Sequence, residues 1–175
     1  DKSGKGLRAL KLSKEEIKET LALVQVLGHL PDPSEPGQLR RYRSVLGTQQ
    51  MELQLRVEAA WAASEEDETD RLAQCRRVEA VRDALASLPP LRAPGGDAPI
   101  VTGQWLMEVG GAKPGPLLGR MKEYVHYVQV DRDLAGLDEV AEVFREEMQS
   151  VPSESDADRY KAHLEALPKL QWPPK

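Results

Sequence analysis

The sequence predicts an all-α protein of about eight helices in two packed subdomains, and three observations carry this prediction. Apolar residues recur at spacings of three and four along most of the chain, beginning with Ile17, Leu21 and Val24. Prolines and glycines fall between these series, where they end helices. The only extended candidate, 99–102, is too short to count as a strand.

The first half of the chain divides into a leading segment and a helical body subdomain over 13–88. Residues 1–12 are expected to be a linker or the end of a preceding region, because the chain opens with neither an initiator Met nor an apolar signal segment. Ser13 and Glu16 have the spacing of a capping box and start the first helix. Two prolines and a glycine make 32–37 a loop.

Three further helices are expected in the body subdomain. One spans 38–46 and stops at Gly47, and the next runs from Thr48 to Ser64. The acidic run that follows suits the start of another helix, where the positive end of the helix dipole favours carboxylates. That helix ends before two prolines, and its apolar stripe predicts a buried, structural Cys75.

The second half begins after a segment rich in proline and glycine, 89–101, which predicts a linker between subdomains. A helical tail subdomain is expected over 102–167, with its first helix capped by Thr102 and its last by Ser155. The end of the chain, 168–175, is expected to be extended or mobile.

Composition and motifs exclude several classes of function. The net charge of −5 argues against a broadly basic protein that coats nucleic acid, although a local basic patch is compatible with it. A single cysteine cannot form an internal disulfide or a cysteine zinc cage, and the three histidines lack metal-ligand spacing. The sequence contains no phosphate-binding Walker loop, nucleophile elbow or dinucleotide fingerprint. It also lacks the apolar run of about 20 residues that a membrane-spanning helix needs.

Two groups of basic residues are candidate RNA-backbone contacts, and the first lies in the helix over 38–46. Arg40, Arg41 and Arg43 flank a tyrosine, and guanidinium groups beside an aromatic ring suit phosphate or stacked-base contact. The alternative is a solvated helix face whose arginines pair with Glu35 or Glu52.

The second group surrounds a proline–glycine–proline turn at 114–116, which predicts a helix–hairpin–helix. In that motif glycines let a phosphate approach the backbone closely, and the second helix points unpaired N–H groups at the anion. Basic side chains nearby add charge without reading base sequence. An ordinary tight αα-hairpin is the alternative. The candidate contacts are Lys113, Gly115, Leu118, Gly119, Arg120 and Lys122.

This segment resembles the C-terminal motif of bacterial-type tRNA nucleotidyltransferases, the CCA-adding enzymes and their poly(A) polymerase relatives. Residues 102–110 are similar to its Thr-Gly-x-Asp-Leu-Met-x-x-Gly half, and 114–119 to its Pro-Gly-Pro-x-x-Gly half. A weaker similarity covers 7–16, which looks like the stretch that leads into the family's helical body. The chain departs from the pattern at Trp105, where an acidic residue is usual, and at Gly111-Ala112, which lengthen the turn.

The resemblance implies that the chain is the non-catalytic body-and-tail portion of such an enzyme. In the family this portion holds tRNA by its backbone and positions the 3′ end, while a separate head domain supplies Mg²⁺-binding carboxylates and uses CTP and ATP. We therefore expect an intracellular RNA-binding protein in cytoplasm, organelle or nucleus, with no catalytic residue, metal or cofactor in this chain and no membrane contact. The other hypothesis is a helical protein–protein interaction module or homodimer without RNA binding, suggested by the acidic net charge and the alanine-rich helix around Trp61.

Overall fold

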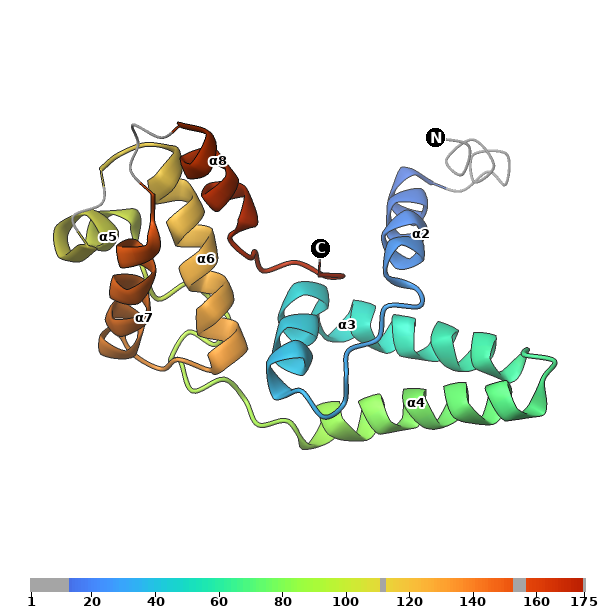
Figure 1. Cartoon of the computed structure of the whole chain (residues 1–175). Helices are drawn as coiled ribbons and strands as arrows, with labels where there is room; N and C mark the ends of the chain where they lie inside the picture. The colour runs from blue at the N-terminus through green and yellow to red at the C-terminus, as the bar shows by residue number, and fades with distance from the viewer. Residues whose placement is uncertain (1–12, 111–112, 153–156, 175) are drawn as a thin grey trace.

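Seven α-helices and no β-strand make up the described part of the chain, so the predicted all-α class is confirmed. The computed structural model describes residues 13–110, 113–152 and 157–174. Figure 1 shows α3 and α4 side by side as a long helical pair, with α5 to α8 gathered at the other end of the molecule. The helices are α2 (Lys14–Val26), α3 (Pro36–Ala63), α4 (Glu68–Ser87), α5 (Gly103–Gly110), α6 (Pro116–Arg132), α7 (Leu137–Ser150) and α8 (Ala157–Ala166).

Helix α3 explains why the described residues form seven helices where about eight were expected. The two helices predicted on either side of Gly47 are joined across a kink, at which Gly47 has φ 69° and ψ 168°. Glycine readily adopts a positive φ, and this non-helical residue separates the two helical stretches that the sequence predicts. Helix α3 also starts at Pro36 rather than at residue 38, because the fixed φ and missing N–H of proline suit the first helical position.

Helix starts follow the local sequence signals. The hydroxyl of Ser13 accepts a hydrogen bond from the Glu16 amide at 3.2 Å, and the Glu16 carboxylate accepts one from the Ser13 amide at 2.7 Å, which completes the predicted capping box. At the start of α4, Asp67 Oδ1 accepts from the Thr69 and Asp70 amides. Thr102 Oγ1 accepts from the Trp105 amide at 3.1 Å at the start of α5. These three caps confirm that short-range signals fix where the helices begin.

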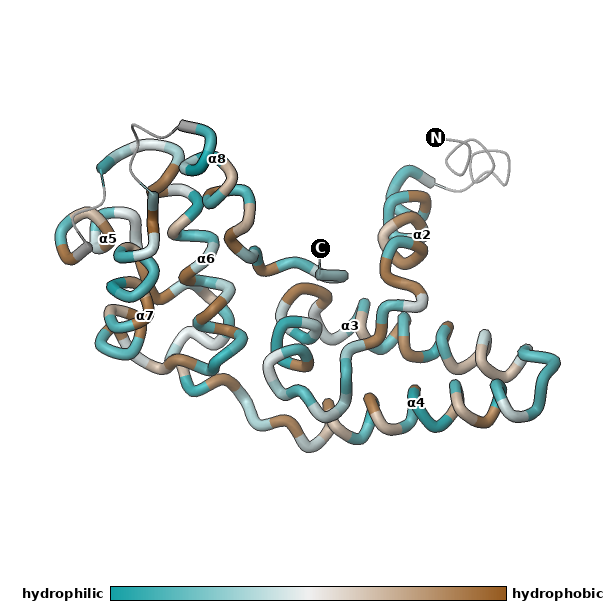
Figure 2. Tube along the Cα trace, in the orientation of Figure 1, coloured by the Kyte–Doolittle hydropathy of each residue, from teal (hydrophilic) through white to brown (hydrophobic). Residues whose placement is uncertain are grey.

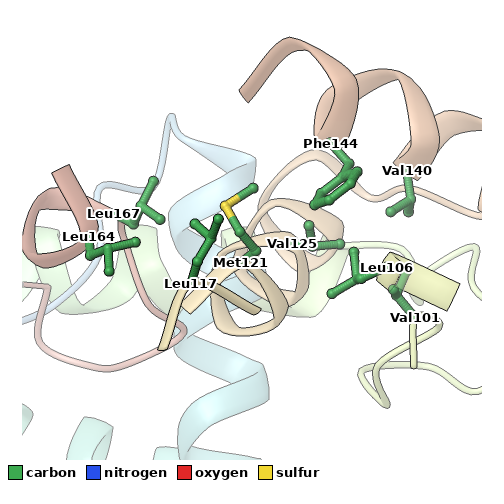
Figure 3. Packing of buried hydrophobic residues seen from close by; sticks show 9 residues of the cluster. All are labelled: Val101, Leu106, Leu117, Met121, Val125, Val140, Phe144, Leu164 and Leu167. Carbon is green, nitrogen blue, oxygen red and sulfur yellow. The ribbon is translucent and has the colours of Figure 1, made fainter. Parts of the chain in front are cut away.

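Two clusters of buried apolar side chains hold the helices together. Along each helix in Figure 2, apolar and polar residues alternate in the way expected of helices with one buried face. The α3 cluster comprises Leu30, Leu39, Tyr42, Met51, Leu55, Val78, Val81 and Leu85. The α6 cluster comprises Val101, Leu106, Leu117, Met121, Val125, Val140, Phe144, Leu164 and Leu167 (Figure 3).

The beginning of α4 corrects one prediction. Its stripe is buried from Val78 onward, but Leu72 is 47% exposed and Cys75 is only half-buried. The prediction of a buried Cys75 is therefore wrong. This end of α4 packs on the second half of α3, where Trp61 is itself 55% exposed, and Figure 1 shows no third described helix over it.

The segment 89–101, predicted as a linker, carries no helix but is bonded to α6. The Ile100 amide donates to Gln129 Oε1 at 3.0 Å, and Gln129 Nε2 donates to the Ala98 carbonyl at 2.9 Å. Gln129 is 2% exposed, and its amide group replaces the backbone partners that an extended segment lacks. The linker thus follows a fixed course along the helix.

The C-terminal segment, expected to be extended or mobile, has no helix after α8 and returns to the α3 cluster. The indole of Trp172 packs edge-on to Tyr42, with ring centroids 5.3 Å apart, and its Nε1 donates to the His29 carbonyl at 2.7 Å. The last turn of the chain is therefore anchored on residues near its beginning. The cap predicted for α8, Ser155, lies outside the described residues.

Candidate nucleic-acid interface

Helices α5 and α6 pack against each other through residues of the 102–121 motif. Leu106 of α5 lies in the α6 cluster with Leu117 and Met121 of α6 (Figure 3). A Cβ added to Gly103 would lie 3.9 Å from the Leu118 side chain, so the two elements touch near the first turn of α6. The two halves of the motif therefore form one helical unit.

The start of α6 is open to solvent. Gly115, just before the helix, has φ 154° and ψ −171°, which only glycine adopts readily, and among the described residues no side chain caps the free N–H groups of the first turn. A Cβ added to Gly119 would meet no atom within 4 Å. Lys113 and Lys122 are both exposed. Uncapped N–H groups at the positive end of the helix dipole, with lysines nearby, favour an anion.

Arg120, the third predicted cation of this turn, has a different environment. Its side chain is 18% exposed, and it donates from Nε to the Leu164 carbonyl at 2.9 Å and from Nη2 to the Leu167 carbonyl at 2.8 Å. It also pairs with the carboxylate of Glu123. Arg120 therefore joins α6 to the end of α8, and a carboxylate already balances its charge.

Arg40 and Arg43 of α3 also bind the ends of other elements. Arg40 donates from Nε and Nη2 to two carbonyl oxygens at the end of α6, at 3.1 and 2.8 Å. Arg43 donates from Nη1 and Nη2 to the Leu88 and Pro89 carbonyls, at 3.2 and 2.8 Å, just after α4. The last carbonyls of a helix have no partner within it, so each guanidinium satisfies a helix end. Within the described ranges, neither arginine forms an ion pair with a carboxylate.

Arg41 is held by a carboxylate and an aromatic ring. Its Nε lies 3.0 Å from Asp131 Oδ1, its Nη1 donates to the Tyr127 hydroxyl at 2.9 Å, and its guanidinium carbon lies 4.9 Å from the centre of that ring. The partners expected in the alternative reading, Glu35 and Glu52, are not those found in the described chain. Arg41 is thus paired with a carboxylate, whereas Arg40 and Arg43 bind carbonyl oxygens, so the three arginines do not share one environment.

A polar cluster between α6, α7 and α8 was not predicted as a site. His163 Nε2 lies 3.3 Å from Glu147 Oε1, and both side chains are largely buried. They line a cavity of about 400 Å³ together with Tyr124. Burial, followed by the negative charge of Glu147, raises the pKa of the Tyr124 hydroxyl, so this phenol stays protonated. The residues come from three helices, which is why no spacing along the chain could indicate the cluster.

Neither a metal-binding cluster nor a membrane-spanning helix is found among the residues that the structure describes. They contain no group of three or more histidine, cysteine, aspartate or glutamate side chains placed to hold a metal ion. None of their helices has the length and apolar character needed to cross a membrane.

No protein-family model, curated protein or solved structure matches the chain. Its resemblance to the tRNA nucleotidyltransferases therefore stays a prediction that rests on its own motifs and on the helical unit that these motifs form.

Proposed function

We propose that this chain is the non-catalytic, RNA-holding C-terminal part of a tRNA nucleotidyltransferase of the CCA-adding and poly(A) polymerase family. It binds tRNA by the backbone and positions the 3′ end for a head domain that supplies the Mg²⁺ ions and binds CTP and ATP. The observation that carries the proposal is the first turn of α6, whose N–H groups have no side-chain cap and which is flanked along the chain by the exposed Lys113 and Lys122.

In this proposal α5 and α6 form a helix–hairpin–helix at the edge of a tail subdomain, and α2 to α4 form the body subdomain. The presence of two separate buried clusters supports the division into two subdomains. The departure at Trp105 is compatible with it, because that ring packs edge-on to Phe144, with centroids 6.3 Å apart, and so fills the core. The substitution therefore need not remove a contact to RNA.

The test is salt-dependent binding of tRNA to single variants of the whole 175-residue chain. Lys113→Glu and Lys122→Glu should each weaken binding and lower the slope of log affinity against log salt by about one, the loss of one phosphate contact. Lys18→Glu, on the exposed face of α2, changes net charge equally and should have no such effect. Equal effects of all three variants would show that only net charge matters and would contradict the proposal.

Gly119→Ala separates ligand approach from folding. No atom lies within 4 Å of the added Cβ, and alanine in a helix is more stable than glycine by about 0.5–1 kcal/mol. The variant should keep or gain stability while losing tRNA affinity, because the methyl group keeps the phosphate from the backbone. Unchanged affinity would mean that no phosphate approaches this turn.

A protein–protein interaction or dimerisation module is the second candidate. One observation favours it: Val26 is the only fully buried residue of α2, whereas Val24 of that helix and Trp61 of α3 are each 55% exposed. Light scattering of the purified chain distinguishes the two. A stable dimer without measurable tRNA affinity would favour the module, and a monomer that binds tRNA would exclude it.

A further inference from the structure

A cavity of about 460 Å³ opens between the kink of α3 and the segment that follows α4. Its lining comes from α3 and from the segment 88–97. Leucine and proline side chains from 88–91 form an apolar wall. The polar lining consists of Arg40, Arg43, Ser44, Thr48 and Asp97.

Neither of the two arginines of this cavity is paired with a carboxylate among the described residues. Within the described part of the chain, Arg40 and Arg43 bind only carbonyl oxygens, which orient a guanidinium group without neutralising it. Arg41 and Arg120, by contrast, each face a carboxylate. A guanidinium has five N–H groups, and each of these two uses only two of them on carbonyls, so donors are left for a ligand.

The rest of the lining leaves the cavity net positive and open. Asp97 is the single carboxylate among its lining residues, and its Oδ2 accepts a hydrogen bond from Ser44 Oγ at 3.0 Å. Gly47 and Gly96 have φ of 69° and 64°, and an added Cβ would meet no atom within 4 Å at either one. The lining thus contains two guanidinium groups and one carboxylate, which already accepts a hydrogen bond from Ser44. These groups lie beside glycine backbone that a ligand can approach closely.

We propose that this cavity binds a phosphate group, and that the group is a phosphodiester of RNA. The identity of the ligand as RNA rests on the proposed function, whereas the anion chemistry rests on the cavity alone. Arg40 and Arg43 donate to the phosphate oxygens from positions fixed by their carbonyl partners, and the Thr48 hydroxyl adds a neutral donor. The cavity is larger than one phosphate, which leaves room for the adjoining ribose against the apolar wall.

The test is a titration of the full chain with inorganic phosphate at constant ionic strength, followed by the backbone amide resonances of Gly47 and Gly96. These should shift and saturate. Thr48→Glu places a carboxylate in the cavity, removes none of the arginine contacts and suits the start of a helical segment, so the fold is kept. It should weaken phosphate binding about tenfold or more. Gln49→Glu adds the same charge at an exposed neighbour outside the cavity lining and should bind as the wild type does.

The absence of saturable shifts, or equal weakening by the two glutamate variants, would overturn the phosphate site. The same variants are then measured with tRNA. Weaker tRNA binding by Thr48→Glu but not by Gln49→Glu supports RNA as the ligand, and unchanged tRNA binding overturns it and leaves a site for free phosphate. If the α6 variants do not alter tRNA affinity, only the proposed RNA contact of the hairpin is contradicted. The phosphate titration measures binding at the α3 cavity independently of that contact.

Discussion

The α6 cluster and the α3 cluster are built differently. All nine members of the α6 cluster are apolar, and they come from one continuous stretch of chain, 101–167. The α3 cluster includes the phenol of Tyr42, lies next to the buried side chains of Gln54 and Glu58, and is completed by Trp172 from near the C-terminus.

The difference shows that holding helices together and fixing their relative positions depend on different interactions. Apolar burial is non-directional and holds helices together in many orientations. A buried hydrogen bond forms in only a few of those orientations. Gln54 Nε2 donates to the Val26 carbonyl at 2.6 Å, and Glu58 accepts from the Gly28 amide at 2.6 Å. These contacts fix where the end of α2 and the following turn attach to α3. The polar contacts of the α6 cluster lie around an apolar interior: Gln129 fixes the 98–100 segment on α6, and Arg120 joins α6 to the end of α8.

The largest expected effect is on the α6 cluster. Phe144 is 2% exposed, and Phe144→Ala should lower the free energy of unfolding by about 3–5 kcal/mol through lost burial and the cavity left behind. Chemical denaturation measures it. Leu137→Ala on the same helix is the control, because that side chain is 41% exposed. A similar loss in both variants would show that this cluster does not depend on tight packing.

The next largest effect is expected from removing the C-terminal residue that packs on the α3 cluster. Trp172→Ala removes an aromatic contact and a hydrogen bond to His29, and it should cost about 2 kcal/mol. Trp172→Phe keeps a ring and should cost about half as much. Hydrogen exchange should report the loss in α3 and not in α7. Equal loss of protection in α7 would mean that the two clusters unfold as one.

Tyr42→Phe sharpens the comparison because it removes a polar atom from the α3 cluster without removing its bulk. The Tyr42 hydroxyl is buried and has no hydrogen-bond partner among the described residues. Burial and then the charge of Glu58 raise the pKa of this hydroxyl, so it stays neutral. The variant should be as stable as the wild type or more stable by up to about 1 kcal/mol. Clear destabilisation in thermal unfolding would reveal a partner for the hydroxyl.

The smallest expected effect concerns the junction between α6 and α7. The Ala135 amide and then Arg92 lower the pKa of Glu139 below its ordinary value of 4.5. Because the folded pKa lies below the unfolded one, the stabilisation is complete above about pH 4.5 and is lost as the pH falls through the folded value. Glu139→Gln should therefore flatten the acid limb of a plot of melting temperature against pH. Glu142→Gln, an exposed control on the same helix, should leave that limb unchanged.

Local features of the fold were predictable from the sequence, and long-range partners were not. Ser13 and Thr102 cap helices through atoms a few residues away, so residue type and spacing were enough. Arg40 binds a carbonyl 90 residues further along, and Trp172 binds one 143 residues back. A backbone carbonyl is the same for every residue type, so no letter in the sequence marks it as a partner.

The residues of the candidate sites also divide into those that local sequence indicates and those that only the fold brings together. Gly115 and the exposed Lys113 and Lys122 were found from turn chemistry, since proline and glycine have local conformational requirements. The cavity beside Arg43 was missed as a unit, because Thr48 and Asp97 meet there only once α3 bends. The basic run in α3 indicated the charge, and only the fold shows which guanidinium groups remain unneutralised.

The bend at Gly47 has a consequence for the size of the whole molecule. A straight helix of 28 residues would be a rod of about 42 Å, because each residue adds about 1.5 Å. The left-handed φ of this glycine turns the rod into a corner, with one arm against α6 and the other along α4. A side chain that let the helix continue would push the two arms into line and lengthen the particle. The hydrodynamic radius of the protein therefore depends on the backbone conformation of one glycine.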